Sequence, residues 1–172
     1  RSLDLARDES PLPKMMCGIS AYSLWWIMVQ YGWYLQNGNR TFLESQKDYL
    51  AELLRYFAGR IQENGAEDLP ENRFIDWPTA DKPDVIHAGL QGIMRMAFQA
   101  GEFLCTELGD GETARLCRDA FEKLGRHIPE HYANKQAAAL LVLAGLADPV
   151  KTTNLVLKRG GARGFSTFMG YY

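Results

Sequence analysis

An aspartate and a tryptophan stand side by side in the segment RFIDWPTADKP, residues 73–83, between two stretches of helical periodicity. An indole offers a flat apolar face to the C–H groups of a sugar ring, and a carboxylate accepts strong hydrogen bonds from adjacent hydroxyls. Pro78 and Pro83 restrict the loop and lower the entropy lost on binding. Asp76 and Trp77 are therefore candidate sugar-binding residues. The alternative is that Trp77 fills the end of a helical core and Asp76 caps a turn.

Two further side chains are expected at the same mouth of the fold. Tyr22 lies near the start of an apolar helix, and His87 lies in the first turn of the helix after the loop. We interpret this histidine as a polar cap or a substrate contact rather than a general base. Asn134 and Gln136 begin a later helix in a similar position. The other aromatic residues of the first helix favour core packing: Trp25, Trp26, Tyr31, Trp33 and Tyr34.

The sequence offers no convincing pair of catalytic carboxylates. Inverting glycosidases hold two carboxylates roughly 6.5–9.5 Å apart across the scissile bond. Asp81 and Asp84, close to Asp76, are better explained as residues of a hydrated turn. The segment RDES, residues 7–10, contains two carboxylates but has no partner in view. No catalytic residue is therefore assigned.

The cysteines and the remaining histidines indicate neither a metal nor a cofactor. Cys17, Cys105 and Cys117 show no CxxC spacing and no nearby histidine in a ligand pattern, so reduced and mostly buried thiols are expected. His127 and His131 flank a proline in a loop and receive no role.

The elements that must position these residues are helices. Proline and glycine make residues 10–18 a loop, and apolar periodicity predicts six helices after it. Thr41 and Glu44 have capping-box spacing at the start of the second helix, and Asp84 and Asp148 are expected to cap the third and the sixth. The predicted helices cover residues 19–36, 41–64, 85–108, 112–127, 133–144 and 149–159.

The helices follow a repeating order. An apolar helix, a tight turn and an amphipathic helix recur three times, with turns at 37–39, 109–111 and 145–148. Such hairpins build either a solenoid or a closed ring in which the apolar helices are enclosed by the amphipathic ones. In a ring, the loops that lead into the inner helices converge at one mouth. Those loops are residues 10–18, 65–83, 128–133 and 160–165.

Composition sets broad limits on the function. The 172 residues suffice for one core, 47% are apolar and 23% are charged, and the net charge is −2. No basic footprint for nucleic acid and no apolar run long enough to span a membrane is present, so neither partner is expected. The chain begins without Met and ends on FMGYY, and both ends look cut from something larger.

Several segments, taken in order, resemble the catalytic domain of bacterial α-L-rhamnosidases. The first is YGWYLQNGNRTFLESQKDYLAELLRYF, which is followed by FIDWP, LGDGETARLCRDAFEKL, NKQAAALLVLAGLADP and GFSTFMGYY. Each motif alone is weak, but their order and spacing cover roughly residues 12–172. The resemblance implies an all-α fold: a partial (α/α)6 toroid of about three helical hairpins, in which residues 1–172 form one partial domain.

The resemblance also implies a function. Members are inverting glycoside hydrolases that cleave terminal α-L-rhamnosides without a cofactor. Trp77 matches the family tryptophan that stacks on the rhamnose ring, and Asp76 goes with it. Tyr22 falls where many members have Trp in a Trp-Gly-Asp stretch, and this departure leaves the exact sugar open.

The resemblance places the catalytic carboxylates elsewhere. The family's acid segment lies upstream and its base segment downstream, so this chain is expected to be inactive alone and to need the rest of the parent barrel. RDES is too close to the Tyr22 helix and lacks the Gly-Trp that follows the acid motif, so it is not that segment. For the parent protein, a periplasmic or secreted location is plausible.

Two other functions remain open. A non-catalytic helical-repeat module would bind a protein along a polar groove. Another (α/α)6 enzyme, a sugar lyase or isomerase, would point His87 into the mouth beside a tyrosine.

Overall fold

The computed structural model describes residues 19–70 and 72–165, and the elements these residues form are all helices. The prediction of an all-α fold is confirmed. The α-helices are α2 (Ser20–Asn37), α3 (Arg40–Ser45), α4 (Lys47–Ala58), α5 (Pro83–Glu107), α6 (Gly111–Leu124), α7 (Lys135–Leu143) and α8 (Pro149–Thr152). A 3-10 turn, η2 (Trp77–Thr79), precedes α5, and a π-helical turn, η3 (Thr153–Leu157), follows α8.

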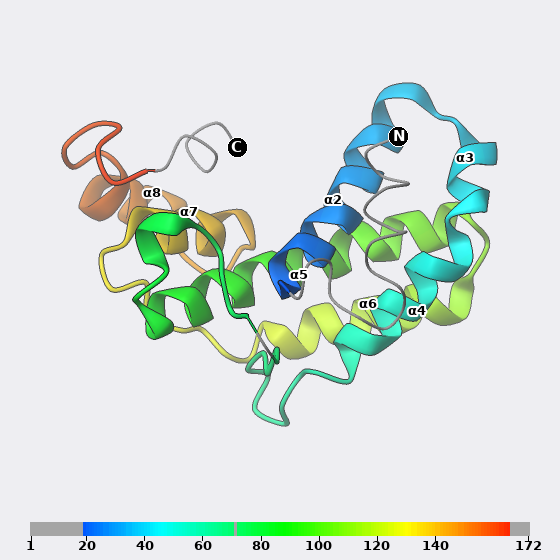
Figure 1. Cartoon of the computed structure of the whole chain (residues 1–172), viewed down its shortest axis with the longest axis horizontal. Coiled ribbons are helices and arrows are strands. Elements are labelled where there is room, and N and C mark those ends of the chain that lie inside the picture. The colour runs from blue at the N-terminus through cyan, green and yellow to red at the C-terminus, as the bar shows by residue number, and fades with distance from the viewer. Residues whose placement is uncertain (1–18, 71, 166–172) are drawn as a thin grey trace.

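The second hairpin packs as the repeating pattern predicts, since α5 lies against α6, whereas α2 packs on α5 rather than on α4. The long helix α5 packs against α2 on one side and α7 on the other, and the second helices α4 and α6 contact each other (Figure 1). Each tight turn from a first to a second helix contains a glycine with a positive φ: Gly38, Gly109 and Gly145. Residues with a Cβ rarely have a positive φ, so a glycine ends each first helix at the equivalent position.

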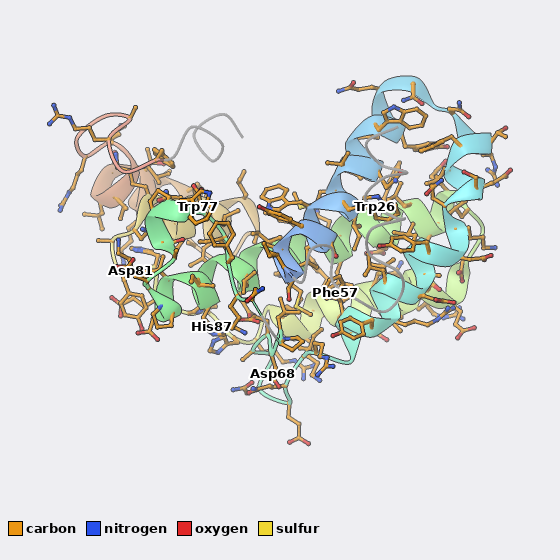
Figure 2. The ribbon with its side chains drawn as sticks, viewed as in Figure 1. Trp26, Phe57, Asp68, Trp77, Asp81 and His87 are labelled. Carbon is orange, nitrogen blue, oxygen red and sulfur yellow. The ribbon has the colours of Figure 1, made fainter. Side chains whose placement is uncertain are left out.

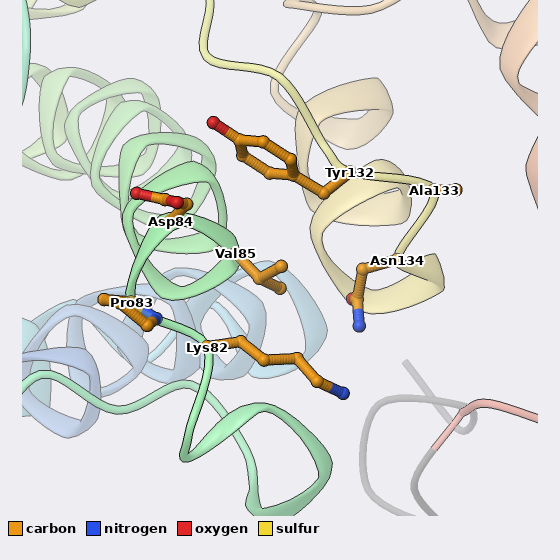
Figure 3. Close-up of a pocket in the computed structure, with 7 residues that line it drawn as sticks. All are labelled: Lys82, Pro83, Asp84, Val85, Tyr132, Ala133 and Asn134. Atoms are coloured by element: carbon orange, nitrogen blue, oxygen red, sulfur yellow. The ribbon is translucent and has the colours of Figure 1, made fainter.

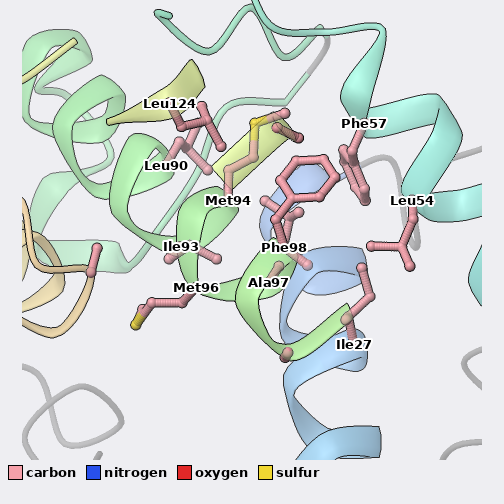
Figure 4. Close-up of a cluster of buried hydrophobic side chains, with 14 of the residues drawn as sticks. Ile27, Leu54, Phe57, Leu90, Ile93, Met94, Met96, Ala97, Phe98 and Leu124 are labelled. Carbon is pink, nitrogen blue, oxygen red and sulfur yellow. The ribbon is translucent and has the colours of Figure 1, made fainter. Parts of the chain in front are cut away.

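The core surrounds α5, whose buried face runs nearly its full length. Phe98, Met94 and Leu90 of α5 meet Ile27 of α2 and Phe57 of α4 in one cluster (Figure 4). Close helix packing depends on small residues. A Cβ on Gly92 would lie 2.8 Å from the carbonyl oxygen of Leu140, so α5 and α7 approach backbone to backbone.

The first helices are not all enclosed, contrary to the expectation from their apolar composition. α2 leaves Val29 48% exposed and Leu35 56% exposed, and Leu143 at the end of α7 is also exposed. The reason is that the described residues supply no helix over these faces. None of the described helices combines the length and the apolar character needed to cross a membrane.

Several predicted helix boundaries were wrong. The helix predicted over 41–64 divides at Gln46 and ends at Ala58, and its cap is Asn39 rather than Thr41, because the Asn39 side chain accepts from the Phe42 N–H. Near the break, the Ser45 hydroxyl donates to the Phe42 carbonyl at 2.6 Å, a local bond that competes with the helix ladder.

Two further boundaries differ, one at the start of α5 and one at the end of α6. α5 begins at Pro83, whose fixed φ suits the first helical position, and Asp84 lies inside the first turn instead of capping it. α6 ends at Leu124, three residues before the predicted end. The predicted cap of the last helix, Asp148, is confirmed, because its side chain accepts from the Lys151 N–H.

Candidate functional site

Trp77 projects from η2 into solvent. Its side chain is 82% exposed, so the alternative in which it fills the core is wrong. Its ring packs edge-on against Phe74, with 5.2 Å between the ring centroids. One neighbouring ring thus restricts the indole while most of its surface stays open for a ligand (Figure 2).

Asp76 immediately precedes this indole and is only 7% exposed. Its Oδ1 accepts from the Trp77 backbone N–H at 2.8 Å, so the expected capping of a turn is present. Its Oδ2 is buried and has no hydrogen-bond partner among the described residues. A buried carboxylate oxygen without a donor is unfavourable, and a sugar hydroxyl could supply that donor.

We call residues 76–79 the Trp77 turn, and packing on both sides holds it. Ile75 is buried between α5 and α7, where a Cβ on Gly89 would come within 2.6 Å of its Cδ1. Thr79 is fully buried, and its N–H and hydroxyl both donate to the Asp76 carbonyl. The loop can therefore present the indole without ordering on binding.

Tyr22 lies where the sequence predicts, in the first turn of α2, and is 38% exposed. The Ser20 hydroxyl donates to the Pro70 carbonyl at 3.2 Å, and Ile19 pairs with Asn72 in an isolated bridge. The start of α2 thus lies against the loop that leads to Asp76. Its contact with a sugar stays a prediction.

The side chain of His87 is engaged by other residues. Its Nδ1 lies 2.6 Å from Oε1 of Glu67, and its Nε2 lies 2.9 Å from Nε2 of His127. In Figure 2 the labelled side chains of His87, on α5, and Trp77, on η2, lie apart. The structure does not bring His87 together with the Trp77 turn, and its role as a substrate contact remains a prediction.

Glu67, Arg73, His87, Gln91 and His127 form what we call the Glu67 cluster. The guanidinium of Arg73 binds both carboxylate oxygens of Glu67, and the Leu69 N–H donates to Oε2 at 3.0 Å. The Gln91 side chain accepts from the Glu67 N–H at 2.8 Å and donates to the carbonyls of Gly65 and Leu124. The cluster thus ties the loop to α5 and to the end of α6.

Two pKa values in this cluster are shifted. Burial alone would raise the pKa of Glu67, but hydrogen bonds from His87 and Arg73 and the charge of Arg73 outweigh it and lower that pKa. Burial lowers the pKa of His127, and His87 lowers it further. No role for His127 could be predicted from the sequence, because a contact across 40 positions leaves no local spacing signal.

A cavity of about 460 Å³ opens beside the start of α5, lined by Lys82, Pro83, Asp84, Val85, Tyr132, Ala133 and Asn134. Lys82 also donates to the Pro78 carbonyl at 3.1 Å, so the cavity adjoins the Trp77 turn. Asn134 caps α7 through the Ala137 N–H, and Gln136 is fully buried. Tyr132 and Ala133 hold positive φ values, unusual for residues with a Cβ, which mark this loop as constrained.

The described residues contain no cluster of three or more histidine, cysteine or acidic side chains that could hold a metal ion. Cys105 and Cys117 are free and buried, as predicted, and Cys17 lies outside the described part of the chain. The contact with Cys105, together with burial, raises the pKa of the Cys117 thiol, so this thiol stays protonated.

Comparisons of the chain with models of protein families, with curated proteins and with solved structures found no match. The geometry of the site and the resemblance of the motifs are therefore the basis for a function.

Proposed function

We propose that the chain is the central part of an (α/α)6 glycoside hydrolase domain similar to α-L-rhamnosidases, and that it supplies sugar-binding residues. The observation that carries this proposal is the pairing, on adjacent residues, of an exposed indole with a buried carboxylate, one oxygen of which has no partner among the described residues. Trp77 would stack on the apolar face of a terminal deoxy-sugar. Oδ2 of Asp76 would accept a hydrogen bond from a ring hydroxyl.

The arrangement of hairpins supports the proposal. The first helices lie next to one another and the second helices α4 and α6 pack together, which is the order of inner and outer helices in a ring of hairpins. The apolar faces left open on α2 and α7 fit a parent barrel whose further hairpins would cover them. These faces do not suit a helical-repeat module that binds along a polar groove.

In the complete enzyme, one carboxylate would protonate the glycosidic oxygen and a second would activate water on the opposite face of the sugar. The family resemblance places both carboxylates outside these residues. The role of this chain is then to fix the sugar ring, which raises the effective concentration of the reacting groups. We expect no turnover of aryl α-L-rhamnosides by the chain alone. Clear turnover would show that the catalytic carboxylates lie within this chain.

Binding tests the sugar site directly. Saturation-transfer NMR with methyl α-L-rhamnoside should give signals with the native chain and lose them with Trp77→Ala. Trp33→Ala is the matched control, because that indole is half-buried against Phe42 near the far end of α2. Unchanged signals in Trp77→Ala, or equal losses in both variants, would contradict the proposal.

A further inference from the structure

A second cavity of about 300 Å³ lies at the start of α7 and carries a strong positive charge. It is lined by Ala133, Asn134, Lys135, Leu155, Val156, Arg159, Arg163 and Gly164. Three of these residues are cationic and none is acidic. Arg159 and Arg163 are exposed and form no ion pair with any other described residue. We call this space the cationic cavity.

Lys135 makes the cationic cavity more than a patch of surface charge. This residue is only 8% exposed. Its ammonium donates to the Gly161 carbonyl and lies 5.4 Å from the centre of the Phe165 ring, and no carboxylate among the described residues pairs with it. A buried charge without a counter-ion is unfavourable, so an anion in the cavity would relieve that penalty. Lys135 is also the first residue of α7, where the helix dipole favours negative charge.

The cationic cavity is a neighbour of the cavity that adjoins the Trp77 turn. Ala133 and Asn134 line both cavities. Lys82 lines the first cavity and is bonded to Pro78 in the Trp77 turn. In Figure 3 the Lys82 side chain extends toward Asn134, whereas Asp84 points away to the other side. Lys82 thus places one positive charge between the Trp77 turn and the cationic cavity.

We infer that the cationic cavity binds the acidic group of a saccharide, either the carboxylate of a uronic acid or a sulfate ester. This inference rests on the proposed function, since it makes the acidic unit the neighbour of the sugar held at Trp77. The substrate class of the parent enzyme is then an anionic oligosaccharide with a terminal deoxy-sugar. Arg159 and Arg163 supply planar guanidinium donors, which match a carboxylate or sulfate in two parallel hydrogen bonds.

The test compares two ligands that differ only in charge. One is a disaccharide of α-L-rhamnose linked to D-glucuronate, and the other is the same disaccharide with its carboxyl group reduced to an alcohol. By titration calorimetry of the native chain, the acidic form should bind about tenfold more tightly, a typical gain from charge-assisted hydrogen bonds. High salt should reduce that preference.

Three variants assign the preference to its residues. Arg159→Gln with Arg163→Gln should reduce the preference to the part that Lys135 supplies and leave binding of the reduced disaccharide unchanged. Lys151→Gln with Lys158→Gln is the matched control, because it removes two exposed charges from the same segment without touching the cavity lining. Trp77→Ala should weaken both ligands alike.

The outcomes separate this inference from the proposed function. Equal affinity of the native chain for both disaccharides, or a preference that is undiminished in the double arginine variant, overturns the inference. If neither disaccharide binds, the proposed function fails, and D-glucuronate alone then tests whether the cationic cavity binds an acidic group. It should shift the backbone amide resonances of Lys135 and of residues 161–164 in the native chain but not in the double arginine variant, and the absence of shifts overturns the inference.

The source of the acidic group is decided by a parallel titration. Shifts with D-glucuronate, D-glucose 6-sulfate or both support a saccharide ligand and show which acid is preferred. Inorganic sulfate should shift the same amides only at much higher concentration. Equal shifts with inorganic sulfate would indicate a simple anion site and overturn the assignment to a saccharide.

Discussion

Two buried carboxylates lie in the same loop between α4 and α5, and they differ in how their oxygens are used. Both oxygens of Glu67 are occupied, by Arg73, by His87 and by the Leu69 N–H. Asp76 has a partner on Oδ1 only, while Oδ2 has none among the described residues, and the exposed indole of Trp77 follows it. Glu67 thus completes a hydrogen-bond network inside the protein, whereas Asp76 keeps one acceptor oxygen without a partner among the described residues.

The comparison shows why burial alone does not identify a site. A buried group with all its hydrogen bonds made within the chain fixes the local structure and has nothing left for a ligand. A buried group with an unused acceptor keeps an unfavourable oxygen that a ligand could satisfy. The Glu67 cluster therefore supports the first part of the loop, whereas the Trp77 turn, which Ile75 and Thr79 hold in place, carries the unused acceptor.

The largest expected effect is at Glu67. Glu67→Gln should lower the free energy of unfolding by about 3 kcal/mol, because a buried charge is lost and an amide donor faces the donors of Arg73 and His87. Urea denaturation monitored by circular dichroism measures this change. Glu44→Gln is the control, since its ion pair with Arg40 is exposed and should contribute less than about 1 kcal/mol. Similar values for the two variants would remove the structural role given to Glu67.

The second effect tests the rigidity of the part of the loop that contains Glu67. Gly65 has a φ of 89°, and a Cβ there would lie 2.2 Å from the Lys123 carbonyl oxygen. Gly65→Ala should destabilise the fold by about 2–3 kcal/mol, from backbone strain and the clash together. Gly32→Ala, within α2 and without any atom within 4 Å of the added Cβ, should instead stabilise by about 0.5–1 kcal/mol. If Gly65→Ala left the free energy of unfolding unchanged, the part of the loop around Glu67 would not be rigid.

The sequence predicted the helices well and the loop poorly, for physical reasons. Helix existence follows from apolar periodicity, and the cap at Asp148 follows from a local side-chain bond. The end of α4 at Ala58 has one local signal, Gly59 at the C-cap, but a single glycine does not exclude a longer helix, and residues 60–64 contain no proline. Long-range ties, such as Lys123 donating to the Ile61 carbonyl, stabilise a non-helical path there.

The candidate site divides in the same way. Asp76 and Trp77 are adjacent in sequence, so their types and the flanking prolines predict a rigid pair. The Glu67 cluster joins positions 67, 73, 87, 91 and 127, which only tertiary packing brings together. The three cations of the cationic cavity are likewise separated in the chain, and no motif marks them.

The third effect is a pH dependence confined to the Glu67 cluster. The pKa of His127 in the folded state lies below its ordinary value of 6.5, so near that pH the unfolded chain binds more protons. Stability should therefore fall modestly as the pH drops below about 6.5. The pKa of Glu67 is lowered in the folded state, so the stability that its charge contributes is lost only as the pH falls below about 4.5, its ordinary pKa. Unfolding free energies measured from pH 7 to pH 5 should decline in the native chain.

His127→Asn separates the histidine from the other titrating groups. Asparagine carries no charge in this range, so the decline between pH 7 and pH 5 should become shallower in the variant. An unchanged slope would place the acid sensitivity outside the Glu67 cluster. Asp76 and Trp77 remain intact in this variant, so its sugar binding at pH 7 should equal that of the native chain.

The smallest expected effect on stability is at Asp76. The change from carboxylate to amide that destabilises the fold at Glu67 should leave stability nearly unchanged here and weaken sugar binding instead. In Asp76→Asn the side-chain oxygen can still accept from the Trp77 N–H, and the lost oxygen made no bond within the described chain. The free energy of unfolding should therefore stay within about 0.5 kcal/mol of the native value. Binding of methyl α-L-rhamnoside should weaken about tenfold, because a charged acceptor becomes a neutral amide. A loss of stability as large as that of Glu67→Gln would mean that Asp76, too, belongs to the support, and the comparison between the two carboxylates would fail.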